Sequence, residues 1–447
     1  MKRWRRFWRI APPYLRSAAR REWQLAVLAF VGLAPGVATV MAWSNLAWSI
    51  GAQPHDDALR TWLLPPLLLD LLGPPGVLVG AGVVTLLIGC LGLANVYLAS
   101  VERRMGELGL LMGLGLNRRE TAGLLLLEVI TIGLMGSGVG LVAGLLLIWL
   151  TGPSAQAFFQ LAAPPAVHPL VLVNGVAVGM LAALLFMGLS ALVVAFELPS
   201  LALRGRQHSE LLDAWQEWRT TLTGTLFAGL LALVAGLPIL EVRAALVLTA
   251  LALALSAMLS LGGWLLTRLY WRLPKPAGTP LWALAVQGLA RHPRHTAGMT
   301  LALTTGSYSV GLAALTWLDG LADSAFPFWV AAMVLVAGAS LVLTAASLAA
   351  LERRREYGLL IALGARRSRL WRLILLEYAI VAAGGGTLGA IMALGNWALS
   401  HGRGAWWLAI GIAVADLLGA LLSAWAGAAP VLWLVTRRSP AVALRDR

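Results

Sequence analysis

The chain has 447 residues, of which 59% are hydrophobic and 12% are charged, and its mean hydropathy is +0.80. A soluble domain carries about a quarter charged residues, so this composition excludes that class. The net charge of +14 would suit a nucleic-acid partner, but the basic residues cluster between long apolar runs. Positive charge at such places faces the cytoplasm and anionic lipid headgroups. We therefore expect a membrane protein that contacts lipid and binds no nucleic acid.

The apolar residues form long unbroken runs, which predict helices because each spanning element must satisfy its own backbone polar groups in lipid. A strand of a membrane barrel would instead alternate with period two. About 20 helical residues cross a bilayer core, and ten runs are long enough. They lie near residues 23–50, 76–100, 120–150, 169–196, 222–239, 244–267, 296–317, 327–350, 371–398 and 405–435. The predicted fold is an all-α membrane protein with ten transmembrane helices.

The loops between these runs alternate in charge. Segments 102–119, 268–295 and 352–372 are rich in Arg, whereas 151–168 contains no Asp, Glu, Lys or Arg. Since Arg-rich loops stay in the cytoplasm, both termini are predicted to lie there, in a multi-pass protein of the plasma (inner) membrane.

The chain divides into four predicted segments. A short amphipathic helix is expected on the inner surface over 207–221, and a short elbow helix over 281–289. The segments are 1–22, basic and interfacial; 23–206, a first four-helix module; 207–278, an amphipathic linker with two extra transmembrane helices; and 279–447, the elbow helix and a second four-helix module.

The outer loop at 51–75 is rich in Leu and Pro, and we expect it to lie along the outer interface. Its cluster of His55, Asp56 and Asp57 has no second group of ligands nearby in sequence, so an ordinary polar loop is favoured over a metal site. Cys90 is the sole cysteine and lies inside an apolar run, which excludes a disulfide framework.

Two cytoplasmic segments resemble each other, 102–115 and 352–364. The spacing between the copies is constant from Glu107 and Glu356 onward, and Glu128 and Glu377 keep it. Each copy also ends with Pro-x-x-Ala-Leu-Arg, at 199–204 and 440–445. The chain is therefore predicted to be an internal duplication of a four-helix module.

A glycine-rich run follows each copy of the charged segment. Glycines four residues apart lie on one helix face and allow another backbone to approach closely. The helix-packing glycines predicted in this way are Gly136, Gly140, Gly144, Gly385 and Gly389.

Each repeated segment has an apolar stripe flanked by Glu and Arg and closed by a Gly, which predicts a short amphipathic helix at the inner surface. One interpretation is a helix that merely lies on lipid headgroups. The other, favoured by its occurrence twice before the same kind of helix, is a docking surface for a cytoplasmic partner. The stripes are Leu110, Leu111 and Leu114 in one copy, and Leu359, Leu360 and Leu363 in the other.

Three acidic residues lie inside the predicted crossings, Glu128, Glu377 and Asp416. A charge at the bilayer centre costs on the order of 3 kcal/mol, so each needs a partner, a proton or water. Glu128 and Glu377 lie near cytoplasmic ends, where interfacial water or a nearby Arg could satisfy them, and bracing near Arg118 or Arg372 is the favoured role. Asp416 lies deeper and is the best candidate for a functional intramembrane acid.

The stretch 352–364, with Arg366, Arg367, Leu376 and Glu377 and the glycines after them, resembles the FtsX-like permease family of ABC transporters. That family includes MacB-type exporters, lipoprotein-release permeases and ten-crossing permeases of antimicrobial-peptide resistance. The resemblance implies that both repeated segments are coupling helices for a cytoplasmic ABC ATPase, present in two copies that bind ATP and Mg. The implied coupling residues are Glu107, Leu108, Gly109, Leu110, Leu111, Leu114 and Gly115, and Glu356, Tyr357, Gly358, Leu359, Leu360, Leu363 and Gly364.

The chain contains no G-x-x-x-x-G-K-[ST] phosphate loop, so it is not expected to be an enzyme itself. The expected function is export or membrane extraction of an amphiphilic lipid, peptide or drug, driven by a separate ATPase. One alternative is ATP-driven signalling across the membrane to a cell-envelope process. Another is ion-coupled secondary transport, which the shortage of buried charges disfavours.

Overall fold

The computed structural model describes residues 23–52, 66–113, 115–189, 191–192, 210–254, 256–257, 280–291, 293–318, 325–352, 367–401 and 406–437. Within these ranges the regular structure is entirely helical, which confirms the predicted all-α class for that part of the chain. The predicted interfacial segment 1–22 lies outside the described residues, as do His55, Asp56 and Asp57 of the outer loop.

The first half of the chain forms four long helices and one short one. They are α2 (Trp23–Gly51), α3 (Pro66–Arg103), α4 (Met105–Gly113), α5 (Arg118–Phe158) and α6 (Pro169–Ala183), which continues into a π-helical turn, η2 (Leu184–Gly188). α3 is kinked at Gly73, directly before Pro74 and Pro75. The φ of Gly73 is 65°, a left-handed value that glycine adopts without strain.

The second half repeats this order of long helices after a connecting region. Its elements are α8 (Glu210–Gly236), the helix Val242–Ala254, α10 (Pro280–Arg291), α11 (Pro293–Leu318), α12 (Phe326–Glu352), α14 (Arg367–His401) and α15 (Trp406–Arg437). We refer below to α2–α6 as the first half and to α11–α15 as the second half.

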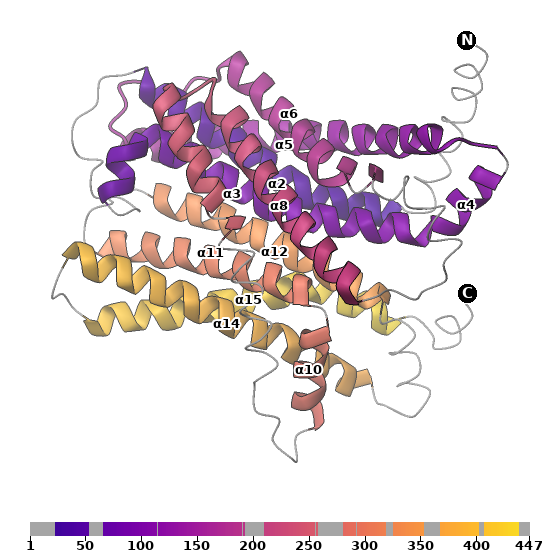
Figure 1. Ribbon diagram of the computed structural model, residues 1–447. Coiled ribbons are helices and arrows are strands. Elements are labelled where there is room, and N and C mark those ends of the chain that lie inside the picture. Colours follow the sequence, from indigo (N-terminus) through magenta and orange to yellow (C-terminus); the bar gives the residue numbers. More distant parts are fainter. Residues whose placement is uncertain are drawn as a thin grey trace, which may run out of the picture.

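Each half is a bundle of long helices that lie side by side (Figure 1). In the first half α2 packs against both α3 and α5, and in the second half α11 packs against α12 and α14. The halves meet where α12 packs against α3 and α2. At one end of this junction the indole of Trp43 makes an edge-to-face contact with the ring of Phe326, with centroids 5.5 Å apart.

Every one of the ten predicted runs overlaps a helix. Six helices among the described residues are long and apolar enough to cross a membrane, on α3, α5, α6, α12, α14 and α15. Two shorter apolar helices, Thr223–Gly236 and Val242–Ala254, lie between the halves. These findings identify a multi-pass membrane protein, while the number of crossings and the side of the termini stay predictions.

Three predicted boundaries are wrong. Part of the predicted outer loop 51–75 is helical, because α3 begins at Pro66 and not near residue 76. The segment 207–221 was expected to form a separate surface helix, but from Glu210 it is continuous with the apolar helix that follows, as the single helix α8. The outer loop 151–168 is shorter than expected because α5 continues through Pro153 to Phe158. All three errors have one cause: a polar stretch or a proline marks the edge of an apolar run, but a helix need not end there.

The lipid-facing surface of the bundle is apolar. Ile410, Val414, Leu418 and Leu422 are all exposed along one side of α15, and Val139, Val142 and Leu146 are exposed on α5. Trp149 and Trp407 are exposed at the ends of these stretches, where indole rings favour the interface between lipid and water. Such a surface requires a hydrocarbon solvent.

Candidate functional site

The helix α4 lies at one end of the bundle, between the ends of α3 and α5 (Figure 1). Leu108 is fully buried, whereas Leu110 is 71% exposed and Glu107 is also exposed. Positions two apart on a helix point to different sides, so α4 rests on the bundle through Leu108 and presents Leu110 outward. The remaining described stripe residue, Leu111, is half-buried.

The end of α4 is closed by Gly115. Its φ of +98° lies in the left-handed region that glycine adopts without strain. The Gly115 N–H donates to the carbonyl of Met112 at 3.0 Å, and the Leu116 N–H donates to that of Leu111 at 3.1 Å. This pair of bonds is the Schellman motif, which satisfies the last carbonyls of a helix and turns the chain sharply. The C-terminal end of α4 is therefore closed by this turn.

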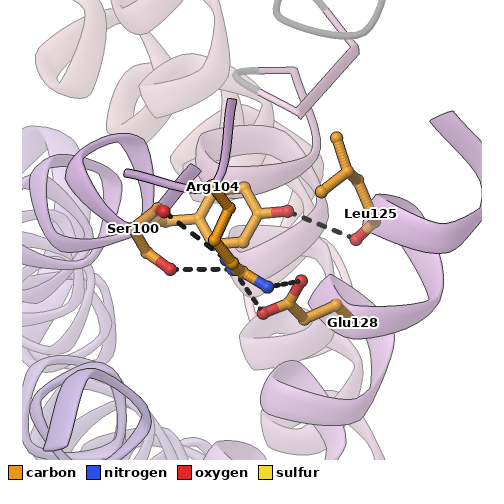
Figure 2. A network of polar contacts seen from close by, with 5 residues as sticks. Ser100, Arg104, Leu125 and Glu128 are labelled. Carbon is orange, nitrogen blue, oxygen red and sulfur yellow. Dashed lines mark hydrogen bonds and ion pairs between the residues drawn. The ribbon is translucent and has the colours of Figure 1, made fainter. Parts of the chain in front are cut away.

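The other end of α4 begins at Arg104, the residue that separates it from α3. The Arg104 carbonyl accepts the N–H of Leu108 at 2.9 Å, which starts the first turn of α4. Its guanidinium points the other way, toward Glu128 on α5 (Figure 2). Nη2 donates to Oε1 of Glu128 at 2.8 Å and Nη1 donates to Oε2 at 3.1 Å. One residue thus connects α3, α4 and α5.

Two further side chains support this ion pair (Figure 2). The Arg104 guanidinium also donates to the hydroxyl of Ser100 at 2.7 Å and to its carbonyl at 3.4 Å. One turn earlier on α3, the Tyr97 hydroxyl donates to the Leu125 carbonyl of α5 at 3.3 Å. The side chains of Arg104 and Glu128 are only 6% and 14% exposed. A paired, hydrogen-bonded arrangement is what allows two charges to be buried there.

The sequence predicted that Arg118 would brace Glu128. Arg118 is instead exposed at the start of α5, and Arg104 forms the ion pair. The tertiary structure decides this, because Arg104 comes from another helix and its approach depends on how α3 packs on α5. The signal that could have identified it is the Glu-Arg-Arg triplet that begins both repeated segments, at 102–104 and 352–354.

The second predicted coupling segment, Glu356 to Gly364, lies outside the described residues, as does Leu114 of the first. The acid that corresponds to Glu128, Glu377, is described on α14 and is buried. Arg372, its expected brace, lies on the same helix.

The third predicted acid, Asp416, lies on α15 and is 3% exposed. Its Oδ2 is 2.7 Å from the hydroxyl oxygen of Ser307 on α11. The same hydroxyl is 3.1 Å from the carbonyl oxygen of Gly386 on α14. The sequence identified the acid, but the structure alone brings it to Ser307 and Gly386.

The predicted glycines lie where helices approach each other. A Cβ on Gly140 would lie 2.6 Å from Cβ of Val37 on α2, and one on Gly389 would lie 2.7 Å from Cβ of Ser307 on α11. Neither space accepts a larger side chain without movement of a helix. Close contacts of the same kind, each to α2 or α11, surround Gly136, Gly144 and Gly385.

Among the described residues, no group of three or more His, Cys, Asp or Glu side chains is arranged to hold a metal ion. Polar side chains from different helices do meet in the ion pair beside α4 and in the Ser307–Asp416 contact.

Comparisons with known proteins identify the family of the chain. The family described as FtsX-like permease C-terminal matches the chain twice, over residues 79–199 and 328–439. The first match includes α4 and its ion pair, and the second includes most of α12 and all of α14 and α15. No curated protein and no solved structure matches the chain. The two matches together span more than half of the sequence, and the chain therefore belongs to the FtsX-like permease family, whose members are membrane permease components.

Proposed function

We propose that this protein is the permease subunit of an ABC transporter and that α4 is a docking helix for a separate cytoplasmic ATPase. The observation that carries the proposal is the division of α4 into two faces, with Leu108 buried in the bundle and Leu110 71% exposed. A leucine exposed outside the membrane segment is stabilised when a partner covers it, and a short helix in a cleft is a common mode of recognition.

The ion pair supplies a path from this helix into the membrane. A force on α4 acts on Arg104, whose backbone begins α4 and whose side chain is bound to Glu128. Because the fork of two hydrogen bonds resists rotation as well as separation, α5 would follow the displacement of α4. α5 in turn contacts α2 through Gly136, Gly140 and Gly144. ATP-driven closure of the partner would in this way reach the helices that face lipid.

Two family matches within one chain support two docking sites and hence two ATPase subunits for each chain. One family description matches both halves, and corresponding glycines of α5 and α14 make corresponding close contacts with α2 and α11. The segment 356–364 would then be the second docking helix, with ATP and Mg bound by the partners. The Arg-rich loops favour placing both docking segments and both termini on the cytoplasmic side of the plasma (inner) membrane.

We infer that the substrate is amphiphilic, namely a lipid, peptide or drug that is exported or extracted from the membrane. Support comes from the apolar outer faces of α5 and α15, along which such a molecule is soluble. The small number of ionisable residues within the helices is also unsuited to an ion-coupled pathway.

The test replaces Leu110 with Asp in the full-length protein, purified with an affinity tag from its own membranes. Wild-type protein is expected to retain an ATPase and to hydrolyse ATP, and Leu110→Asp is expected to lose most of both. The matched control is Leu237→Asp, since Leu237 is another exposed leucine, in the turn after α8. Unchanged ATPase retention in Leu110→Asp, or no ATPase with the wild type, would refute the assignment of α4.

A further inference from the structure

Asp416 lies at a three-helix contact in the second half of the bundle. It projects from α15 to Ser307 of α11, and Ser307 in turn contacts the backbone of α14 at Gly386. A Cβ on Gly311 would be 3.0 Å from Oδ2 of Asp416, so the carboxyl group occupies space that this glycine leaves open. The carboxyl group therefore fills a space that is both closed and shared by three helices.

The hydrogen bonds around Ser307 restrict the protonation state of Asp416. Its hydroxyl is 2.7 Å from Asp416 Oδ2 and 3.1 Å from the Gly386 carbonyl oxygen, yet a hydroxyl has one proton to donate. If Asp416 were ionised, Ser307 would face two acceptors and satisfy one. A protonated Asp416 donates to Ser307, and Ser307 then donates to Gly386. Only the protonated acid completes both bonds.

The charges nearby do not offset an ionised carboxylate. Ser307 is the hydrogen-bonding partner of Asp416 among the described residues, and no basic side chain there contacts the acid. On α11 the nearest titratable group along the chain is Tyr308, and on α14 Glu377 is nine residues from Gly386, about 13 Å along the helix. Apart from Asp416, the sequences of α12 and α15 contain one charged residue each, Glu352 and Arg437, at the last position of each helix.

The corresponding position in the first half of the bundle has no polar contact of this kind. Gly140 contacts Val37 as Gly389 contacts Ser307, so Val37 and Ser307 occupy corresponding positions on α2 and α11. The apolar Val37 has no proton to donate. The polar contact is therefore particular to the second half.

One helical turn further along α2 and α11, the larger side chain and the glycine that it contacts have exchanged helices between the two halves. In the first half the side chain of Met41 on α2 lies against Gly175 of α6. In the second half the acid of α15 lies against Gly311 of α11. A thioether side chain and a carboxyl group thus fill equivalent spaces, from opposite helices. The carboxyl group of Asp416 thus occupies a space whose equivalent in the first half contains an apolar side chain. Such a space favours the neutral acid over the ionised one.

We propose that Asp416 is an intramembrane proton-binding site: it is protonated in the folded protein at neutral pH and joins α15 to α11 and α14 through Ser307. The site takes a single proton as its ligand. Loss of that proton would leave a carboxylate among helices that offer it one hydroxyl, so the attachment of α15 weakens when the medium becomes alkaline. This inference does not depend on the ATPase or on transport.

Infrared spectroscopy of the full-length protein in lipid vesicles tests the protonation state. At neutral pH the wild type is expected to show the carbonyl stretch of a protonated carboxyl group, and Asp416→Asn is expected to lose that intensity. The matched control is Glu241→Gln, which removes an exposed acid and should leave the band unchanged. A band equally strong in Asp416→Asn would overturn the proposal.

Thermal unfolding of the same proteins gives a second, independent readout. The folded wild type holds a proton that the unfolded chain releases, so its stability falls with rising pH relative to Asp416→Asn. The asparagine still donates to Ser307 and cannot ionise, so it lacks this contribution. Parallel pH profiles of the wild type and Asp416→Asn up to strongly alkaline pH would overturn the proposal. A decline in thermal stability with rising pH that occurs in the wild type and in Glu241→Gln, and is absent from Asp416→Asn, would support the proposal.

Discussion

Arg104 and Glu128 form a forked ion pair, with two hydrogen bonds of 2.8 and 3.1 Å between the guanidinium and the carboxylate. The pair joins the end of α3 to α5 directly beside the start of α4. Besides the buried Leu108 and the turn at Gly115, the ion pair of Arg104 therefore provides a polar connection between α4 and the membrane-embedded part of α5.

Removal of one partner of this pair should destabilise the protein strongly. Glu128→Ala leaves the Arg104 guanidinium buried without its counter-charge, and we expect a loss of about 3 kcal/mol in the free energy of unfolding. Ser100 remains as a hydrogen-bonding partner, which limits the loss. Denaturant unfolding of the purified chain in detergent measures it. Glu241→Ala, which removes an exposed acid, is the control and should change little.

A double-mutant cycle separates the pair from its surroundings. Arg104→Ala with Glu128→Ala should cost less than the two single substitutions added together, by about 1 kcal/mol or more. Additive effects would show that the ion pair contributes nothing of its own.

The crossing of α2 and α3 should depend on Gly89. A Cβ at this position would collide with the carbonyl oxygen of Gly32 on α2, and backbone cannot move aside as a flexible side chain can. Gly89→Ala is therefore expected to separate the two helices and to lower the yield of folded protein or its melting temperature. Size-exclusion profiles and thermal unfolding in detergent measure both.

Gly138→Ala is the matched control for this substitution. Gly138 is also within a long helix, but a Cβ there meets nothing within 4 Å. Alanine has the higher helix propensity, by up to about 1 kcal/mol, so this variant should be as stable as the wild type or more stable. Equal stability of Gly89→Ala and Gly138→Ala would contradict the close approach of α2 and α3.

Asn45 should hold the segment that precedes α6. Its side-chain oxygen accepts the N–H of His168 at 2.9 Å, and its amide donates to the Ala166 carbonyl at 3.1 Å. Asn45→Leu keeps the volume and removes both bonds, so the segment 161–168 should open more readily, by about 2 kcal/mol. Hydrogen exchange of the backbone amides in this segment is expected to accelerate accordingly.

Asn174→Leu provides the comparison. Asn174 is also a buried asparagine, but its amide donates to Ala235 at the end of α8, at 3.2 Å. Its replacement should leave exchange in 161–168 unchanged. Equal protection of 161–168 in the wild type and Asn45→Leu would show that the rings of Trp48 and His168, stacked with centroids 4.5 Å apart, are sufficient to hold the segment.

The sequence by itself determined the class and the order of the helices. Hydrophobic runs that are long enough to cross a bilayer can only be helices in lipid. The positions of α12 and α14 therefore follow from where the apolar residues lie in the sequence. The family could also be predicted from the repeated charged segment, and the comparison confirmed it. The length of α5 and the continuity of α8 could not, because neither a proline nor a polar stretch determines where helical hydrogen bonding ends.

Only the tertiary structure decided which residues meet. Glu128 could be recognised as an acid in need of a partner, but Arg118 was the nearest candidate along the chain and Arg104 is the one that the packing of α3 on α5 delivers. The same holds for Asp416, whose contact with Ser307 joins positions 109 residues apart. The physical reason is that burial creates the need for a polar partner locally, whereas the partner is supplied by how separate helices cross.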